Sequence, residues 1–132
     1  FSCGYGLSGR LGHGDEEHQL TPKVIEALRD ERVVAVAAGD AHSLVLTEAG
    51  AVLSFGSGEY GRLGHGDEEH QRTPKVIEAL RGERVVAVSA GDFHSIVLTE
   101  AGAARSVRVP SAPNPMVRSL FCPMLPGRCC AV

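Results

Sequence analysis

Short runs of β-branched and aliphatic residues recur along the chain, and each run ends at a glycine or a charged turn. Three such runs separated by tight turns predict short strands at 33–36, 42–47 and 51–55. A long loop rich in glycine and charge follows at 58–73, and 74–77 predicts a fourth strand that starts with Pro74, a residue suited to a first position or a sheet edge. Residues 78–81 favour a helix by propensity, but four residues are too few to hold one. The pattern therefore predicts an antiparallel four-stranded meander with one long loop.

The same pattern occurs twice, with a period of 52 residues. The segment from Arg10 to Gln19 recurs without change from Arg62 to Gln71, and forty of the fifty pairs between 1–50 and 53–102 are identical. This self-similarity indicates tandem copies of one structural unit. A single meander of this size cannot bury both faces, so it needs neighbours on each side. Four strands in about fifty residues predict a β-propeller blade, and hence an all-β fold.

Blade and repeat boundaries are offset along the chain. We predict one complete blade from Val33 to about Leu80, preceded by two outer strands from 1–28 and followed by two inner strands from 85–99. Open sheet faces on both sides would make this piece only marginally stable or prone to aggregation by itself. We therefore expect a fragment of a longer propeller that needs neighbouring repeats or self-assembly to cover these faces. The predicted core residues are Val24, Ile25, Leu28, Val33, Val36, Leu44, Leu46, Val76, Ile77, Leu80, Val85, Val88, Ile96 and Leu98.

Charge and composition change at about residue 103, which divides the chain into a first repeat at 1–52, a second at 53–102 and a tail at 103–132. All 16 acidic residues and nine of the 13 basic ones lie within 1–102, giving that part a net charge of −7. This charge disfavours direct contact with nucleic-acid phosphates. No apolar stretch is long enough to span a membrane.

The tail holds five of the seven prolines, three of the four cysteines and four arginines without an acidic residue. We expect it to be disordered or an artefact of the gene model, with a basic tail that touches membranes or nucleic acid as the alternative. Without a Cys-x-x-Cys spacing or a secretory leader, free thiols in an intracellular compartment, cytoplasm or nucleus, are expected.

Several repeated residues could be mistaken for a chemical site. The histidines lack a closed ligand set for a metal, so we expect His65 and His94 to hydrogen-bond backbone groups in tight loops. The glycines lack the Gly-Lys-Ser/Thr signature of a phosphate loop and are expected to permit tight turns. Asp40, His42 and Ser43 are too close along one strand to form a catalytic triad. We therefore predict no catalytic residue, metal or cofactor, and a structural motif made of Gly12, His13, Gly14, Gly39, His42, Gly64, His65, Gly66, Gly91 and His94.

Four blocks in a fixed order carry a family resemblance. They read FGSGEYGRLGHG at 55–66, PKVI at 74–77, VVAVSAGDFHS at 85–95 and LTEAG at 98–102. Together they resemble the repeat of the regulator of chromosome condensation family, over about residues 1–102. The resemblance implies blades of a propeller that usually has seven, of which this chain carries two repeats.

Charged and variable loop positions are the candidate partner contacts. Each repeat carries an acidic triplet, at 15–17 and 67–69. These triplets either lie in solvated loops or form a recurrent acidic rim that meets a basic partner surface. The repeats also differ in loops, where Ser8 and Ala41 become Tyr60 and Phe93. The predicted contact positions are Asp15, Glu16, Glu17, Tyr60, Arg62, Asp67, Glu68, Glu69 and Phe93.

The resemblance implies a non-catalytic module for protein–protein interaction, with a protein partner and no small-molecule substrate. One alternative is part of an exchange factor for a Ran-type small GTPase, although neither the β-wedge nor the basic arm of the family's founding member is found here. Another is the propeller segment of a HECT-type ubiquitin ligase, whose catalytic cysteine domain is not in this sequence. The plant ultraviolet-B photoreceptor of the family uses clusters of tryptophan, and this chain has none.

Overall fold

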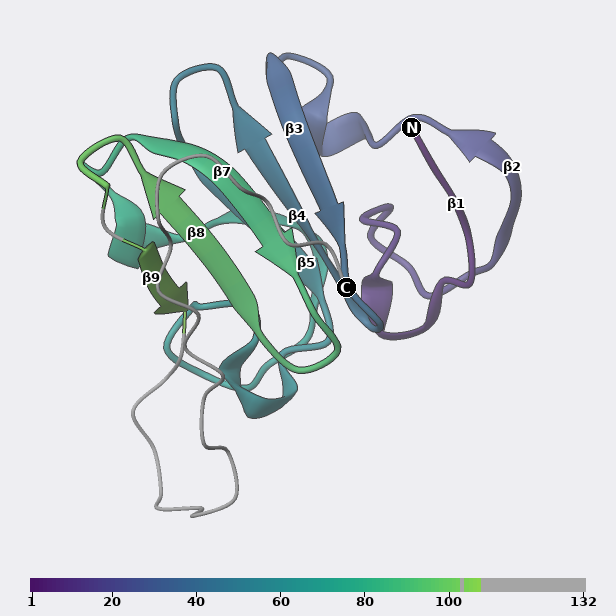
Figure 1. Ribbon diagram of the computed structural model, residues 1–132. Helices are drawn as coiled ribbons and strands as arrows, with labels where there is room; N and C mark the ends of the chain where they lie inside the picture. The colour runs from purple at the N-terminus through teal and green to yellow at the C-terminus, as the bar shows by residue number, and fades with distance from the viewer. Residues whose placement is uncertain (103, 108–132) are drawn as a thin grey trace.

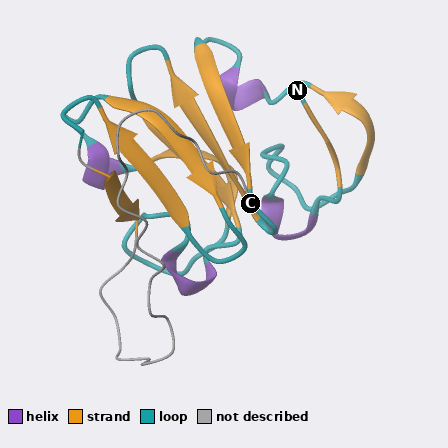
Figure 2. Cartoon of the chain, viewed as in Figure 1, coloured by secondary structure: helices purple, strands orange, loops and turns teal. Residues whose placement is uncertain are grey.

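The computed structural model describes residues 1–102 and 104–107, which form three antiparallel sheets placed side by side (Figures 1 and 2). We name them blade A, blade B and blade C in chain order. Blade A pairs two strands, blade B has four strands in chain order, and blade C has three. The strands are β1 (Ser2–Gly4) and β2 (Gln19–Lys23) in blade A; β3 (Val33–Ala38), β4 (His42–Thr47), β5 (Val52–Gly56) and β6 (Gln71–Val76) in blade B; and β7 (Val85–Ala90), β8 (Ser95–Thr99) and β9 (Ala104–Val107) in blade C. The predicted complete blade between two incomplete ones is confirmed.

Two local features of the blades differ from the sequence prediction. Strand β6 begins at Gln71, so Pro74 lies inside it, where the outer edge of the sheet tolerates a residue without an N–H. Residues Glu78–Leu80 form a single 3-10 turn (η4). The sequence prediction considered only an α-helix at this position and rejected it as too short. A 3-10 turn needs only three residues, and similar turns are η1 (Leu7–Gly9), η2 (Glu26–Leu28) and η3 (Glu59–Gly61).

Strand β9 corrects the prediction that disorder begins at residue 103. Its register on β8 pairs Ser95 with Val107, and the equivalent pair in blade B, 52 residues earlier, is Ser43 with Phe55. The chain thus continues the repeat at 104–107, because strand pairing uses main-chain hydrogen bonds and does not require the apolar residues that the prediction looked for. Residue 103 and residues 108–132, with the three tail cysteines, lie outside the described residues.

The apolar core lies between the blades. One cluster joins blades B and C through Leu44, Leu46, Val52, Ile77, Leu80, Val85 and Val97, and a second joins blades A and B through Ile25, Val45, Leu53 and Phe55. Leu44 is fully buried by blade C, whereas the equivalent Ile96 in blade C is 42% exposed. The core of each blade is therefore completed by the blade that follows it.

Alternation along the strands explains the errors in the predicted core. In β3, Ala35 and Ala37 pack against the cluster between blades B and C, so Val36 on the opposite face is 72% exposed. Val33, Val76 and Ile96 are also exposed, contrary to the prediction. In β3 the small alanines, and not Val36, face blade C, whereas Val85 and Val88 of β7 pack against the same cluster.

Candidate functional site

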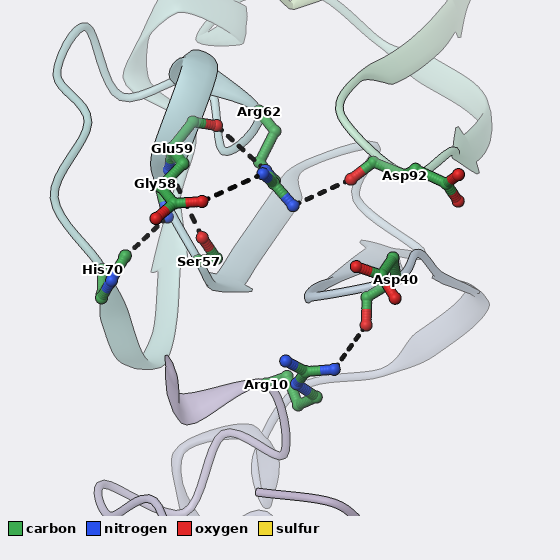
Figure 3. Close-up of polar contacts among 8 residues, drawn as sticks. All are labelled: Arg10, Asp40, Ser57, Gly58, Glu59, Arg62, His70 and Asp92. Carbon is green, nitrogen blue, oxygen red and sulfur yellow. Dashed lines mark hydrogen bonds and ion pairs between the residues drawn. The ribbon is translucent and has the colours of Figure 1, made fainter. Parts of the chain in front are cut away.

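The turn η3 carries Arg62 into the junction between blades B and C (Figure 3). Its Nε donates to the carbonyl oxygen of Glu59 at 2.9 Å, and its Nη1 donates to that of Asp92 in the β7–β8 turn at 2.8 Å. Its Nη2 lies 3.6 Å from Oε2 of Glu59, and the side chain is only 2% exposed. The buried guanidinium therefore links the long loop of blade B to the turn between β7 and β8 of blade C. We call this set of hydrogen bonds from one arginine to two carbonyl oxygens the bracket.

The main chain of Arg62 is held from blade C as well. Oγ of Ser95 donates to the carbonyl oxygen of Arg62 at 2.8 Å, and Nε2 of His42 lies 2.8 Å from the same Oγ. Since the serine proton is used by the carbonyl, His42 donates from Nε2 to the serine, and its ring is the Nε2–H tautomer. This serine is therefore not activated by a histidine base, and the pair is structural.

Two exposed aromatic rings lie on the bracket. Tyr60 and Phe93 are 65% and 60% exposed, and their rings meet edge to face with centroids 5.5 Å apart. Cζ of Arg62 lies 5.7 Å from the Tyr60 ring centroid and 5.2 Å from that of Phe93. We call Tyr60 and Phe93 the aromatic platform; it takes one ring from each blade.

The junction between blades A and B repeats the bracket without the platform. Nε of Arg10 donates to the carbonyl oxygen of Leu7 at 3.0 Å, and its Nη1 donates to that of Asp40 (Figure 3). Ser8 and Ala41 stand where blades B and C have Tyr60 and Phe93, so Arg10 remains half-buried. The two junctions share one hydrogen-bond scheme and differ in what covers the guanidinium.

The repeated histidines close the long loops. Nδ1 of His70 accepts from the N–H of Gly58 at 3.1 Å, and Nδ1 of His18 accepts from that of Gly6 at 3.0 Å. Nε2 of His65 lies 2.9 Å from Oγ of Ser54, which itself donates to a loop carbonyl, and His13 meets Ser2 in the same way at 3.0 Å.

Burial shifts the acidity of two of these histidines. Desolvation by burial, then the charges of Arg62 and His94, lower the pKa of His42 from 6.5 to about 4, and Asp40 opposes the shift. Burial, followed by Lys75, also lowers the pKa of His65, against the opposing effects of Asp67 and Ser54. Both rings therefore favour the neutral form, which suits their hydrogen bonds.

The structure separates the predicted contact positions into two groups. Tyr60, Phe93, Glu17, Glu68 and Glu69 are exposed, while Asp15, Glu16 and Asp67 are partly buried. Asp67 Oδ1 accepts from the N–H of Glu69 at 3.1 Å, and Asp15 holds Glu17 in the same way. Arg62 corrects the prediction, since a buried side chain bound to carbonyl oxygens is not free to contact a partner.

The motif glycines occupy positions that are either crowded or in the left-handed backbone conformation. A side chain on Gly39 or Gly91 would collide with the ring of His42 or His94, and Gly12 and Gly64 have φ of +78°. Sequence reasoning missed Ser95 and Ser54 as the residues that hold the loops. The available signal was that the equivalent residues of the first repeat are also serines, Ser43 for Ser95 and Ser2 for Ser54.

Within residues 1–102 and 104–107, no group of three or more His, Cys, Asp or Glu side chains is placed to hold a metal ion. Among the same residues, no helix is long and apolar enough to cross a membrane.

Comparison with known proteins identifies the repeat. The sequence pattern of the family described as "Regulator of chromosome condensation (RCC1) repeat" matches residues 1–46 and 49–98, and a second pattern of that description matches 33–62. The chain belongs to the RCC1 repeat family. Human E3 ubiquitin-protein ligase HERC2 is 49% identical over 102 residues, covering 76% of this chain and 2% of that protein. The ultraviolet-B receptor UVR8 of Arabidopsis thaliana is 42% identical over 102 residues, covering 77% of this chain and 23% of that protein.

Solved structures give the same fold. The crystal structure of Prp20p from Saccharomyces cerevisiae, a protein with binding properties to Gsp1p and histones, superposes with a TM-score of 0.67 at 30% identity. The match covers 77% of this chain and 26% of that one. This chain thus spans about a quarter or less of the length of these relatives.

We expect Arg62→Met to cost about 2–4 kcal/mol of the unfolding free energy, because it leaves two carbonyl oxygens unpaired in a buried junction. The matched variant Arg10→Met should cost less than about 1 kcal/mol, since the equivalent guanidinium is half-exposed to water. Urea unfolding of the 132-residue chain measures both losses. Equal losses would contradict the distinction between the two junctions.

Stability should fall as the pH is lowered from 6.5 towards 4, because the unfolded chain binds a proton at His42 near pH 6.5 and the folded chain only near pH 4. The difference in unfolding free energy between the wild type and His42→Gln should therefore be larger at pH 7 than at pH 4.5. Leu63→Ala, which keeps His42, serves as the control, and its difference from the wild type should not shrink in this way. A His42→Gln difference that is independent of pH would show that the ring does not titrate in this window.

Proposed function

We propose that this chain is a non-catalytic protein-binding part of an RCC1-type propeller, and that it contacts its partner through the face on which η1, η3 and the β3–β4 and β7–β8 turns lie. The observation that carries the proposal is the exposed aromatic platform on a buried Arg62, which joins this face across two blades. Rigid scaffolds that present variable loops are a common basis for recognition. An intracellular setting, in cytoplasm or nucleus, belongs to the same proposal.

The residue chemistry on this face supports binding in preference to catalysis. Ser95, His42 and Asp40 do not form a triad, because the serine proton is used by the carbonyl of Arg62 and Nδ1 of His42 has no hydrogen-bond partner among the described residues, so the Asp40 carboxylate does not orient the ring. The histidines of the long loops are occupied with serine hydroxyls and backbone N–H groups. What remains available to a partner is a surface of aromatic rings and carboxylates.

Site-specific photo-cross-linking tests the assignment of the contact face. A photoreactive residue at Glu68, in the exposed loop of blade B, should give discrete adducts with protein in cell extract. The same residue at Thr21, exposed on the outer strand β2, is the control and should give none. Adducts from Thr21 alone, or from neither position, would contradict the proposed face.

Nucleotide exchange on a small GTPase is the second candidate, favoured by the similarity to yeast Prp20p, which binds Gsp1p. Exchange requires an element that deforms the nucleotide site, whereas His65 and His70 in the long loop of blade B bind groups of their own blade. The third candidate, a targeting segment of a ubiquitin ligase, is favoured by the similarity to HERC2. It is compatible with the binding role proposed here.

We expect the chain at micromolar concentration to leave the rate of GDP release from a Ran-type GTPase unchanged. Release of a fluorescent GDP analogue measures this, with removal of magnesium as the positive control for release. Accelerated release by the chain would favour the exchange-factor function over the passive binding role.

A further inference from the structure

We propose that the aromatic platform of Tyr60 and Phe93 is the docking point for a basic protein segment, which places an arginine side chain on the exposed ring faces. This inference rests on the proposed function and names the surface and the class of partner. It concerns one junction of the chain, between blades B and C.

Folding stability does not account for these two rings. Both are more than half exposed, so they gain little from burial. Tyr60 also has φ of +59°, a left-handed conformation that is unfavourable for a bulky side chain, and the equivalent Ser8 has φ of +60°. A junction with Ser8 and Ala41 forms the same bracket, so the fold does not require aromatic residues here.

The platform is fixed before any partner arrives. Arg62 lies beneath both rings and is held by the carbonyl oxygens of Glu59 and Asp92. The edge-to-face contact, with an interplanar angle of 86°, locks the rings against each other. Rings held in this way bind a partner at a low cost in conformational entropy.

The charge around the platform selects a basic partner. Glu59 offsets the charge of Arg62, so the buried guanidinium is not an isolated cation beneath the rings. The carboxylate of Asp92, next to Phe93, points away from Arg62 in Figure 3 and has no hydrogen bond or ion pair within the described part of the chain. Arginine fits such a surface, because its planar guanidinium stacks on a ring and pairs with a carboxylate.

The acidic loop of blade B extends this surface. The backbone of Gly58, next to η3, lies against the main chain of Glu68 and Glu69, where a side chain on Gly58 would collide with the Glu69 carbonyl. Both glutamates are exposed. The acidic loop and the turn that carries Tyr60 thus lie together, and a basic segment on the platform would also approach these carboxylates.

The test uses a defined probe, an acetylated nonapeptide of alternating glycine and arginine, titrated into the isotope-labelled 132-residue chain and followed by NMR. We expect saturable shifts at Tyr60, Phe93 and the 67–69 loop. The same peptide with citrulline in place of arginine is isosteric but uncharged, and it should bind at least about fivefold more weakly.

The matched variant is Tyr60→Ser combined with Phe93→Ala, which copies the residues of the first junction. It should weaken peptide binding at least about fivefold, whereas Tyr5→Ser, which removes an exposed ring stacked over Arg10, should leave it unchanged. Nuclear Overhauser contacts between arginine side-chain protons and the two rings of the wild type are expected, and they test the proposal even if the double variant fails to fold.

Three results would overturn the inference. The first is equal affinity of the wild type for the arginine and citrulline peptides. The second is equal affinity of the wild type and the double variant for the arginine peptide. The third is a set of chemical-shift changes at the platform that depend on protein concentration in the absence of peptide, which would indicate a second copy of the chain as the occupant. If peptide binding fails while cross-links from Glu68 persist, only this inference falls. If both fail, the proposed function falls with it.

Discussion

The buried guanidinium of Arg62 makes the junction between blades B and C a fixed joint. It binds carbonyl oxygens on both sides of the junction, and its own carbonyl accepts a hydrogen bond from Ser95 of the next blade. Because the apolar clusters also lie between blades, neighbouring sheets are joined by a polar bracket at one end and by core packing along their faces. The positions of η3 and the β7–β8 turn on the contact face depend on this joint.

The same arrangement explains why the residues that make these bonds are identical in the two repeats. Arg10 and Arg62, with Ser43 and Ser95, make equivalent bonds 52 residues apart. A substitution in such a residue would disturb two blades at once, whereas a substitution at an exposed loop position leaves the joint intact. Ser8 and Tyr60 show this freedom, since both adopt the same left-handed backbone with different side chains.

Much of the architecture could be predicted from the sequence, because the glycine turns, strand patterns and 52-residue period are local or repeated signals. The role of Arg62 could not, since arginine is ordinarily a surface residue and its partner at Asp92 is a main-chain carbonyl that no side-chain pattern marks. Strand β9 was missed because Arg105 and Ser106 interrupt the apolar pattern, although its register continues the repeat. The pairing of Tyr60 with Phe93 depends on the joint, so only the structure brings them together.

Arg62 is locked between two blades beneath two aromatic rings. NMR observation of its side-chain Nε–H in the 132-residue chain tests this arrangement directly. We expect a resolved, slowly exchanging proton with Overhauser contacts to the ring protons of Phe93, and faster exchange for the equivalent proton of Arg10. A rapidly exchanging Arg62 proton without contacts to the rings would contradict it.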